Sequence, residues 1–356
     1  MLILAINPGS TSTKISVSKD LDFIFTQTLR HDTEEIARYP RILDQYNFRK
    51  EIIIDALRDN HIGIDDLHCV VGRGGLIKPI PGGVYKVNDA LIDDLRKEIL
   101  GEHASNLGGI LANEISTVST THIPAFIVDP VVVDELEDIA RFSGHPYLPR
   151  VSIFHALNQK AVARRYCKEK KCEYENVNLI VVHLGGGITV GAHCRGRVID
   201  VNNGLDGDGP FSPERTGGLP IGALTKLCFS GKYQLHEIKK MITGKGGLVA
   251  YLRSNNATEI ENRINKNDSY AKSVFEAMAY QTAKEIGACA AVLKGKVDAI
   301  ILTGGLAFSE PITKWIKERV GFIAPVEIYP GEDEMKALTE GAYYAMTGEL
   351  PIKDYI

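Results

Sequence analysis

The first seventeen residues constrain the fold of this chain more than any other stretch. Five apolar residues, Leu2 to Ile6, run into the polar turn Asn7-Pro8-Gly9-Ser10, and apolar alternation resumes at Ile15. This pattern predicts a β-hairpin whose glycine lets the backbone bend sharply. Hydroxyls, one amide and Lys14 crowd the turn, and such groups can wrap a phosphate while the lysine supplies positive charge. An ordinary polar hairpin turn fits the same residues.

Two further glycine turns follow, each directly after an apolar strand. The predicted strand 178–182 leads into His183-Leu184-Gly185-Gly186-Gly187, and a β-branched strand follows at 188–190. The predicted strand 299–302 leads into Thr303-Gly304-Gly305, and a helix follows from about Pro311. Strand, glycine turn and strand therefore open each half of the chain, which indicates an internal repeat. The triple glycine is no dinucleotide fingerprint because a strand follows it, and no P-loop motif occurs.

Length and composition narrow the class of protein. The 356 residues suffice for two ordinary domains, and a net charge of −4 argues against nucleic acid as a partner. No cationic leader or apolar run of about 20 residues occurs, which argues against a signal peptide and a membrane span. The six cysteines form no C-x-x-C pair, as in reduced cytosolic proteins. We therefore expect a cytoplasmic protein.

The remaining pattern predicts alternating strands and helices. Further strands are expected at 23–29, 69–71, 125–128 and 326–329, and helices at 31–60, 89–100, 113–117, 221–229, 235–242, 268–293 and from 331–334 through 344. A loop rich in Gly and Pro at 142–150 suggests a domain boundary.

Several charged residues stand at strand ends or in loops, where functional groups often lie. Arg73 sits among glycines after strand 69–71, either facing a cleft or on a surface turn. Asp129 ends strand 125–128, either as a functional carboxylate or as a cap of segment 131–140. Arg215 lies in the long loop 203–220, and loops of that length are usually functional or disordered. The acids at 332–334 fit simple helix capping.

Together these motifs resemble the acetate and butyrate kinase family, part of the superfamily of sugar kinases, Hsp70 chaperones and actin. Residues 7–14, NPGSTSTK, are similar to its N-x-G-S-x-S-x-K, and His183 to Gly187 to its H-L-G-x-G. Phe154-His155 and Arg215-Thr216-Gly217 add weaker matches. Acetate kinases usually carry R-x-x-H-G-G, whereas this chain has Arg73-Gly74-Gly75 and is shorter. Both departures resemble the butyrate branch.

The resemblance implies an α/β fold of the two-domain actin-like ATPase (acetate and sugar kinase) type, with duplicated domains and an interdomain cleft. The expected domains are 1–148, joined by a C-terminal helix from about 335–356, and a nucleotide-binding domain at 149–334. ATP would lie in the cleft, and closure would expel water, which competes as phosphoryl acceptor.

The resemblance also implies roles for particular residues. Catalytic roles fall on Asn7, Arg73, Asp129, His155 and Arg215. Contacts to ATP or ADP fall on Ser10, Ser12, Lys14, His183, Gly185, Gly186, Gly187, Gly304 and Gly305. Mg²⁺ would be held by phosphates, waters and one or two carboxylates, with Asp333 and Glu334 as candidates. An unassigned histidine is otherwise most often structural.

The implied reaction is reversible phosphoryl transfer from ATP to butyrate or a similar short-chain or branched-chain acid. A carboxylate is already ionised at pH 7, so positioning and charge neutralisation matter more than a general base. The expected partners are small-molecule carboxylates and nucleotides, with no nucleic acid or membrane, in a homo-oligomer. The alternatives are an acetate or propionate kinase, a sugar or polyol kinase in which Asp129 is a general base, and a nucleotide-gated chaperone or filament subunit.

Overall fold

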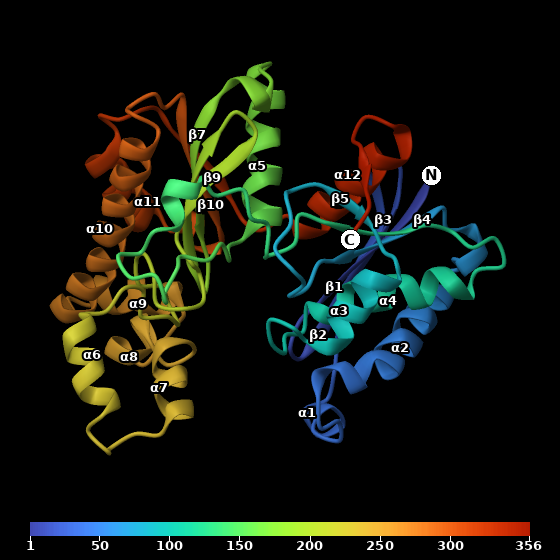
Figure 1. Cartoon of the computed structure of the whole chain (residues 1–356), viewed down its shortest axis with the longest axis horizontal. Helices are drawn as coiled ribbons and strands as arrows, with labels where there is room; N and C mark the ends of the chain where they lie inside the picture. The colour runs from blue at the N-terminus through green and yellow to red at the C-terminus, as the bar shows by residue number, and fades with distance from the viewer. The chain divides into compact units, whose positions relative to one another are not determined.

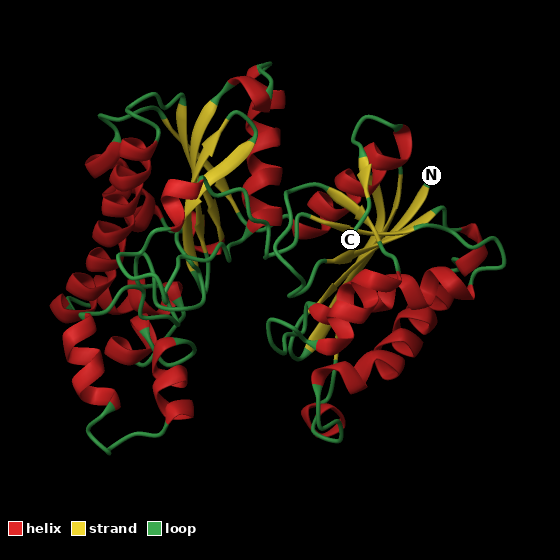
Figure 2. Ribbon diagram, in the orientation of Figure 1, coloured by secondary structure: helices red, strands yellow, loops and turns green.

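The computed structural model describes all 356 residues, and the chain forms two compact units. The first unit combines Met1–Val133 with Asp333–Ile356, and the second spans Asp134–Glu332. Each unit is a β-sheet flanked by helices (Figures 1 and 2). None of the helices is long and apolar enough to cross a membrane.

The first unit is built on a seven-stranded sheet of order β12-β5-β6-β4-β1-β2-β3. Its strands are β1 Leu2–Pro8, β2 Ser12–Lys19, β3 Asp22–Arg30, β4 Cys69–Arg73, β5 Val84–Lys86, β6 Ala125–Val128 and β12 Ile352–Lys353. The predicted hairpin is confirmed, because β1 pairs antiparallel with β2. β1 also pairs parallel with β4, so the turn after β1 and the end of β4 lie at the same edge of the sheet.

Helices cover both faces of this sheet (Figure 1). On one face, α2 Tyr46–Asp59, α3 Asp89–Lys97 and α4 Asn106–Val118 share a core with Leu4 and Ile6 of β1. The other face carries α12 Glu334–Thr347, which contacts β1 and β4.

The packing of α4 on β4 depends on two glycines. A Cβ added at Gly72 would lie 2.0 Å from the carbonyl oxygen of Gly108. A Cβ added at Gly108 would lie 2.1 Å from the carbonyl oxygen of Arg73. The helix backbone therefore lies directly against the strand, at the position from which Arg73 projects.

The second unit has a five-stranded sheet of order β11-β10-β7-β8-β9. Its strands are β7 Asn178–Leu184, β8 Ile188–Cys194, β9 Arg197–Val201, β10 Ala299–Gly304 and β11 Val326–Pro330. Alternate residues of β7 face opposite layers: Leu179 and Val181 pack with α5 Ala156–Lys170, whereas Ile180 and Val182 pack with α10 Ser269–Val292. The other helices are α6 Ile221–Cys228, α7 Leu235–Ile242, α8 Gly247–Leu252, α9 Ala257–Asn265 and α11 Glu310–Val320.

The two sheets share one topology at their centre. In each, three consecutive antiparallel strands are followed by a strand that pairs parallel with the first of the three. The order β3-β2-β1-β4 thus corresponds to β9-β8-β7-β10. This correspondence confirms the internal repeat that the glycine turns indicate.

Several predicted elements are wrong in extent. Residues 31–60 are not one helix, because α1 Thr33–Ile36 ends before Pro40 and a 3₁₀ turn at Ile42–Gln45 precedes α2. Proline disfavours helical backbone at the residue before it. The helix predicted at 113–117 begins at Asn106, and residues 131–140 form no α-helix for Asp129 to cap. The helices α5, α8 and α9 and the short strands β5 and β12 are not predicted from the sequence.

The glycine contact between β4 and α4 gives a stability prediction. Gly108→Ala should lower the free energy of unfolding by about 1–3 kcal/mol, because the methyl group overlaps a strand carbonyl. Urea unfolding followed by circular dichroism measures this loss. As the matched control, Gly287→Ala in α10 adds a methyl group with no atom within 4 Å, and should be neutral or stabilising. Equal effects at the two positions would contradict the close-packing argument.

Candidate active site

The opening turn displays its polar groups on one face of the first sheet. The β1–β2 register pairs Asn7 with Lys14 and Pro8 with Thr13. Directly opposed residues point to the same face and alternate residues share it, so Asn7, Ser12 and Lys14 lie together and Thr13 lies opposite. Asn7 and Ser12 are half-buried, whereas Lys14 is exposed, as is Ser10 in the turn.

A fully buried arginine supports this turn from behind. Nη1 of Arg49 on α2 donates to the carbonyl oxygens of Gly9 at 2.8 Å and Ser12 at 3.1 Å, and to Oγ1 of Thr13 at 3.0 Å. Its Nη2 donates to the carbonyl oxygen of Ser10 at 3.1 Å, and Nε and Nη2 both donate to Oε1 of Gln45. Burial lowers the pKa of Arg49 to about 10, so the side chain stays charged at neutral pH.

This arrangement directs the turn's donors away from Arg49. In a trans peptide the C=O and the next N–H point in opposite directions. The carbonyls of Gly9 and Ser10 point to Arg49, so the N–H groups of Ser10 and Thr11 point to the other side. Arg49 is not among the residues predicted from the sequence, although its spacing of four from Ile53 places a charge on the buried face of α2.

Asn7, Arg73 and Glu334 form one polar cluster at the turn. Nδ2 of Asn7 donates to Oε2 of Glu334 at 2.5 Å, and Nη1 of Arg73 lies 3.1 Å from the same oxygen. Arg73 Nη1 also donates to Oδ1 of Asn7 at 3.3 Å. Glu334, the first residue of α12, therefore orients two of the five residues to which the resemblance gives catalytic roles.

Asp129 has a different environment. Its buried carboxylate accepts the N–H of Gly83 at 2.7 Å, and its own N–H donates to the carbonyl oxygen of Gly83 at 3.0 Å. Its φ of +37° is uncommon for a residue with a side chain. Residues 131–140 form no α-helix, so the alternative that Asp129 caps a helix there is wrong. Its carboxylate holds the loop before β5.

The carboxylates near the turn fit Mg²⁺ bound together with a nucleotide. Mg²⁺ usually keeps several waters and takes one or two protein carboxylates plus substrate phosphates. The chain holds no group of three or more His, Cys, Asp or Glu that could form a protein cage for a metal, and this mode needs none. Glu334 has the required oxygen chemistry beside the turn, and Asp333 precedes it at the N-cap without a side-chain cap hydrogen bond.

Two stacked histidines stand at the corresponding edge of the second sheet. The rings of His155 and His183 lie 3.7 Å apart and within 8° of parallel. Nδ1 of His183 bonds Oδ1 of Asn158 at 2.8 Å, and its Nε2 lies 3.2 Å from Oε1 of Glu332. Nδ1 of His155 bonds Oγ1 of Thr189 at 3.0 Å.

Arg215 lies over the triple-glycine turn. A Cβ at Gly187 would be 1.9 Å from Nη1 of Arg215, so only glycine leaves room for this side chain. Nη1 donates to the carbonyl oxygen of Gly204, and burial lowers the pKa of Arg215 while Glu214 opposes that effect. Oγ of Ser212 donates to the carbonyl oxygen of Gly186 at 2.6 Å, which ties the arginine's loop to the turn.

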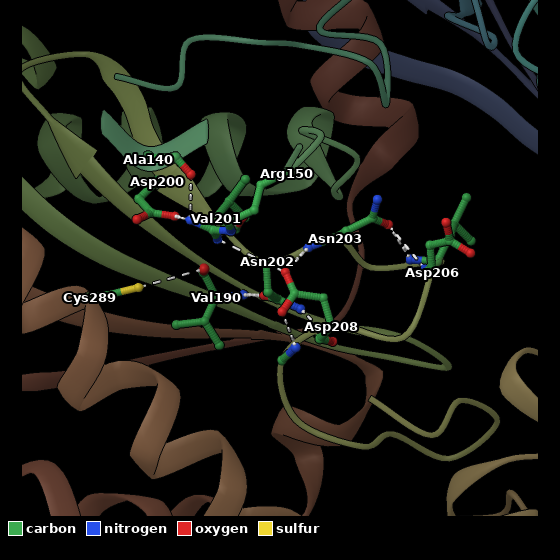
Figure 3. A network of polar contacts seen from close by, with 12 residues as sticks. Ala140, Arg150, Val190, Asp200, Val201, Asn202, Asn203, Asp206, Asp208 and Cys289 are labelled. Atoms are coloured by element: carbon green, nitrogen blue, oxygen red, sulfur yellow. Dashed lines mark hydrogen bonds and ion pairs between the residues drawn. The ribbon is translucent and has the colours of Figure 1, made fainter. Parts of the chain in front are cut away.

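The loop that carries Arg215 is anchored at its start by the polar network of Figure 3. Arg150 pairs with Asp200 at 2.8 Å and donates to the carbonyl oxygens of Ala140 and Val201. Asp208 accepts the N–H groups of Asn203 and Gly209. The long loop is therefore ordered by side chains that the sequence analysis did not single out.

The third glycine turn ends β10 in the same sheet. Gly304 exchanges backbone hydrogen bonds with Gly331 at 3.1 and 3.0 Å. A Cβ at Gly305 would meet nothing within 4 Å, so the protein's own packing leaves that side open. The turn thus lies at the same edge as the triple glycine, because β10 and β7 are parallel neighbours.

Comparison with solved structures shows the fold. Acetate kinase from Porphyromonas gingivalis matches with a TM-score of 0.78 at 20% identity, covering 97% of this chain and 99% of that one. Propionate kinase from Francisella tularensis matches with a TM-score of 0.75 at 18% identity, covering 95% and 98%. The chain therefore has the actin-like fold of acetate and sugar kinases, as the sequence predicted.

Comparison of sequences gives the family. The sequence model of the acetokinase family matches residues 145–310. "Butyrate kinase 2" of Clostridium acetobutylicum is 57% identical over 353 residues, covering 99% of this chain and 99% of the relative. This chain belongs to the acetokinase family, and it is a phosphotransferase with a carboxyl group as acceptor.

The buried imidazole beside Arg49 gives a pH prediction. His31 bonds Thr13 Oγ1 at 2.9 Å, and burial together with Arg49 lowers its pKa from 6.5 to about 4. As pH falls from 6.5 to 4, the unfolded chain binds a proton that the folded chain resists. Folding should then lose up to about 3 kcal/mol over this window, and stability should be fully present above it.

Urea unfolding of the wild type and His31→Gln at a series of pH values measures this contribution. The variant should have a flatter pH dependence between 4 and 6.5. His236→Gln, which removes an exposed imidazole from α7, is the control and should retain the wild-type slope. An unchanged slope in His31→Gln would contradict the assignment.

Proposed function

We propose that this chain is a butyrate kinase, which transfers the γ-phosphoryl group of ATP to butyrate or a similar short-chain or branched-chain acid. The observation that carries the proposal is the 57% identity to the butyrate kinase over nearly the whole of both chains. The glycine pair after Arg73, in place of the R-x-x-H-G-G of acetate kinases, agrees with it.

The proposed reaction is an in-line displacement. A carboxylate oxygen of the acid forms a bond to the γ-phosphorus, and the bond from that phosphorus to the β–γ bridging oxygen breaks. The products are the acyl phosphate and ADP, and the reverse reaction makes ATP. The acid is ionised at neutral pH, so no side chain has to remove a proton.

In the first unit, Asn7 and Arg73 would bind the oxygens of the reacting carboxylate and phosphoryl group. A guanidinium suits this role because its N–H groups match two oxygens at once. Glu334 supports the proposal because it already orients both side chains. Asp129 would act by holding the loop at Gly83 and not as a general base.

The opening turn would contact the phosphates of ATP. Its N–H groups and the residues Ser10, Ser12 and Lys14 supply hydrogen-bond donors and one positive charge. Mg²⁺, when bound, would neutralise phosphate charge, with Glu334 or Asp333 reaching it directly or through water.

In the second unit, we assign the nucleotide to the glycine turns at Gly185 to Gly187 and Gly304-Gly305. The open side of Gly305 supports close approach of a ligand. His155, His183 and Arg215 would donate to phosphoryl oxygens, where charge develops in the transition state. We also propose that each unit is an actin-like ATPase domain and that the enzyme works in the cytoplasm as a homo-oligomer.

The preference of the enzyme among acids of different chain length tests which acid is the substrate. An apolar pocket gains about 0.8 kcal/mol for each buried methylene, so butyrate should exceed acetate by about 1.6 kcal/mol, or about 15-fold in kcat/KM. Phe154 is buried and precedes His155, and it is one candidate to line this apolar pocket. Trapping acyl phosphates as hydroxamates with acetate, propionate, butyrate, isobutyrate and valerate at fixed ATP and Mg²⁺ measures the profile. A steady fall from acetate upward would reject butyrate, and no hydroxamate with any acid would reject the carboxylate acceptor.

The two arginines test the site. Arg73→Lys and Arg215→Lys should each lower kcat by about 10²-fold or more, because lysine keeps the charge and loses the paired donors. Arg58→Lys is the matched control, since Arg58 is exposed on α2 and pairs only with exposed Asp55 in the same helix. Circular dichroism checks folding. Full activity of both site variants would contradict the proposed binding of oxygens by guanidinium groups.

A further inference from the structure

A chain of five hydrogen-bonded side chains leads from the interior of the second unit to His155. The hydroxyl of Tyr174 lies 2.6 Å from Nδ1 of His193, whose Nε2 lies 3.0 Å from Oε1 of Gln159. Nε2 of Gln159 lies 2.8 Å from Oγ1 of Thr189, which lies 3.0 Å from Nδ1 of His155. Gln159, Thr189 and His193 are fully buried.

Secondary structure explains why these residues meet. Gln159 follows His155 by four residues at the start of α5, so the two share one helix face. Thr189 and His193 are four residues apart on β8 and therefore share one sheet face. Thr189 is also paired across strands with His183, the ring on which His155 stacks.

The directions of the first three hydrogen bonds, from Tyr174 to Thr189, follow from the atoms that can only donate or only accept. Gln159 Nε2 also donates to the carbonyl oxygen of Thr189 at 3.1 Å, which can only accept, so the amide nitrogen must face Thr189. Oε1 of Gln159 then faces His193, whose Nε2 must carry a proton. Burial, with Lys160 and Arg164, lowers the pKa of His193 well below its ordinary value, so the ring is neutral. Its Nδ1 therefore accepts the hydroxyl proton of Tyr174.

The fourth hydrogen bond of the chain joins Thr189 to His155. Oγ1 of Thr189 accepts an N–H of Gln159, so its own hydroxyl proton can go to Nδ1 of His155. Nδ1 is then the acceptor nitrogen of this ring, and in the neutral ring the proton lies on Nε2.

We propose that Thr189 is a positioning residue that holds His155 as its Nε2–H tautomer, and that Gln159 and His193 set the direction of the Thr189 hydroxyl. His155 thereby presents a hydrogen-bond donor at Nε2, the atom that would contact a phosphoryl oxygen. The role in phosphoryl transfer rests on the proposed function, whereas the tautomer is a property of the free enzyme. A hydrogen-bond donor whose position is fixed in advance stabilises developing charge without reorganisation in the reaction.

The tautomer is measured by ¹⁵N NMR on the full-length enzyme labelled at histidine, at a pH above the ordinary titration range of the imidazole. The spectrum of His155→Gln identifies the signals of His155 by their loss. The wild type should show a protonated Nε2 and an unprotonated Nδ1 for this ring. Thr189→Val keeps the side-chain shape without the hydroxyl, and should give a mixture of tautomers or a protonated Nδ1. Thr189→Ser should restore the wild-type pattern.

Kinetics gives a second readout. Thr189→Val should lower kcat by about 10-fold or more with little change in KM, because a wrong tautomer affects the transition state more than binding. Thr282→Val is the matched control, since it also removes a buried hydroxyl, one that donates to the helix carbonyl of Met278. It should leave both the His155 signals and kcat unchanged.

Two results would overturn the proposal: a protonated Nδ1 on His155 in the wild type, or an unchanged His155 pattern in folded Thr189→Val. The NMR measurement needs no turnover, so it is independent of the substrate. Full activity of His155→Gln would instead reject the catalytic role given to His155 in the proposed function, while the predicted tautomer would still be confirmed by the spectrum.

Discussion

The site of the first unit depends on one buried charge. A buried guanidinium is costly unless its N–H groups are satisfied, and Arg49 satisfies them with carbonyl oxygens of the opening turn, Thr13 and Gln45. The same hydrogen bonds point the carbonyl oxygens of the turn toward Arg49, so that N–H groups are left on the face of the turn opposite Arg49. One requirement of the interior thus preorganises the surface that an anion would contact.

The second unit uses the same backbone with different chemistry. Asn7 and His183 are each the sixth residue of a seven-residue first strand, so they occupy corresponding positions in the repeat. The amide in the first unit pairs with Glu334, and the imidazole in the second pairs with Glu332. The repeat therefore supplies equivalent sheet edges that carry different side chains. The first unit offers an amide and a guanidinium, and the second offers stacked imidazoles.

Elements with a strong local pattern could be predicted, and elements defined by distant contacts could not. The opening hairpin, the strands before each glycine turn and the long helix α10 follow from periodicity and turn residues. The short strands β5 and β12 pair with each other although most of the chain separates them, and neither has a distinctive pattern of its own. For the same reason Gly83, the partner of Asp129, was not predicted.

The sequence by itself determined the family, the duplicated glycine turns and the residues proposed to carry the site's chemistry, because these depend on residue type and local spacing. Only the tertiary structure decided how those residues are held. Asn7 meets Glu334 across 327 positions, and Thr189 reaches His155 across 34. The tertiary structure also placed Arg49 against the carbonyl oxygens of the opening turn. The local sequence pattern shows only that this residue is a charge on a helix. Hydrogen-bond partners are set by packing between elements, and packing between distant elements leaves no periodic signal in the chain.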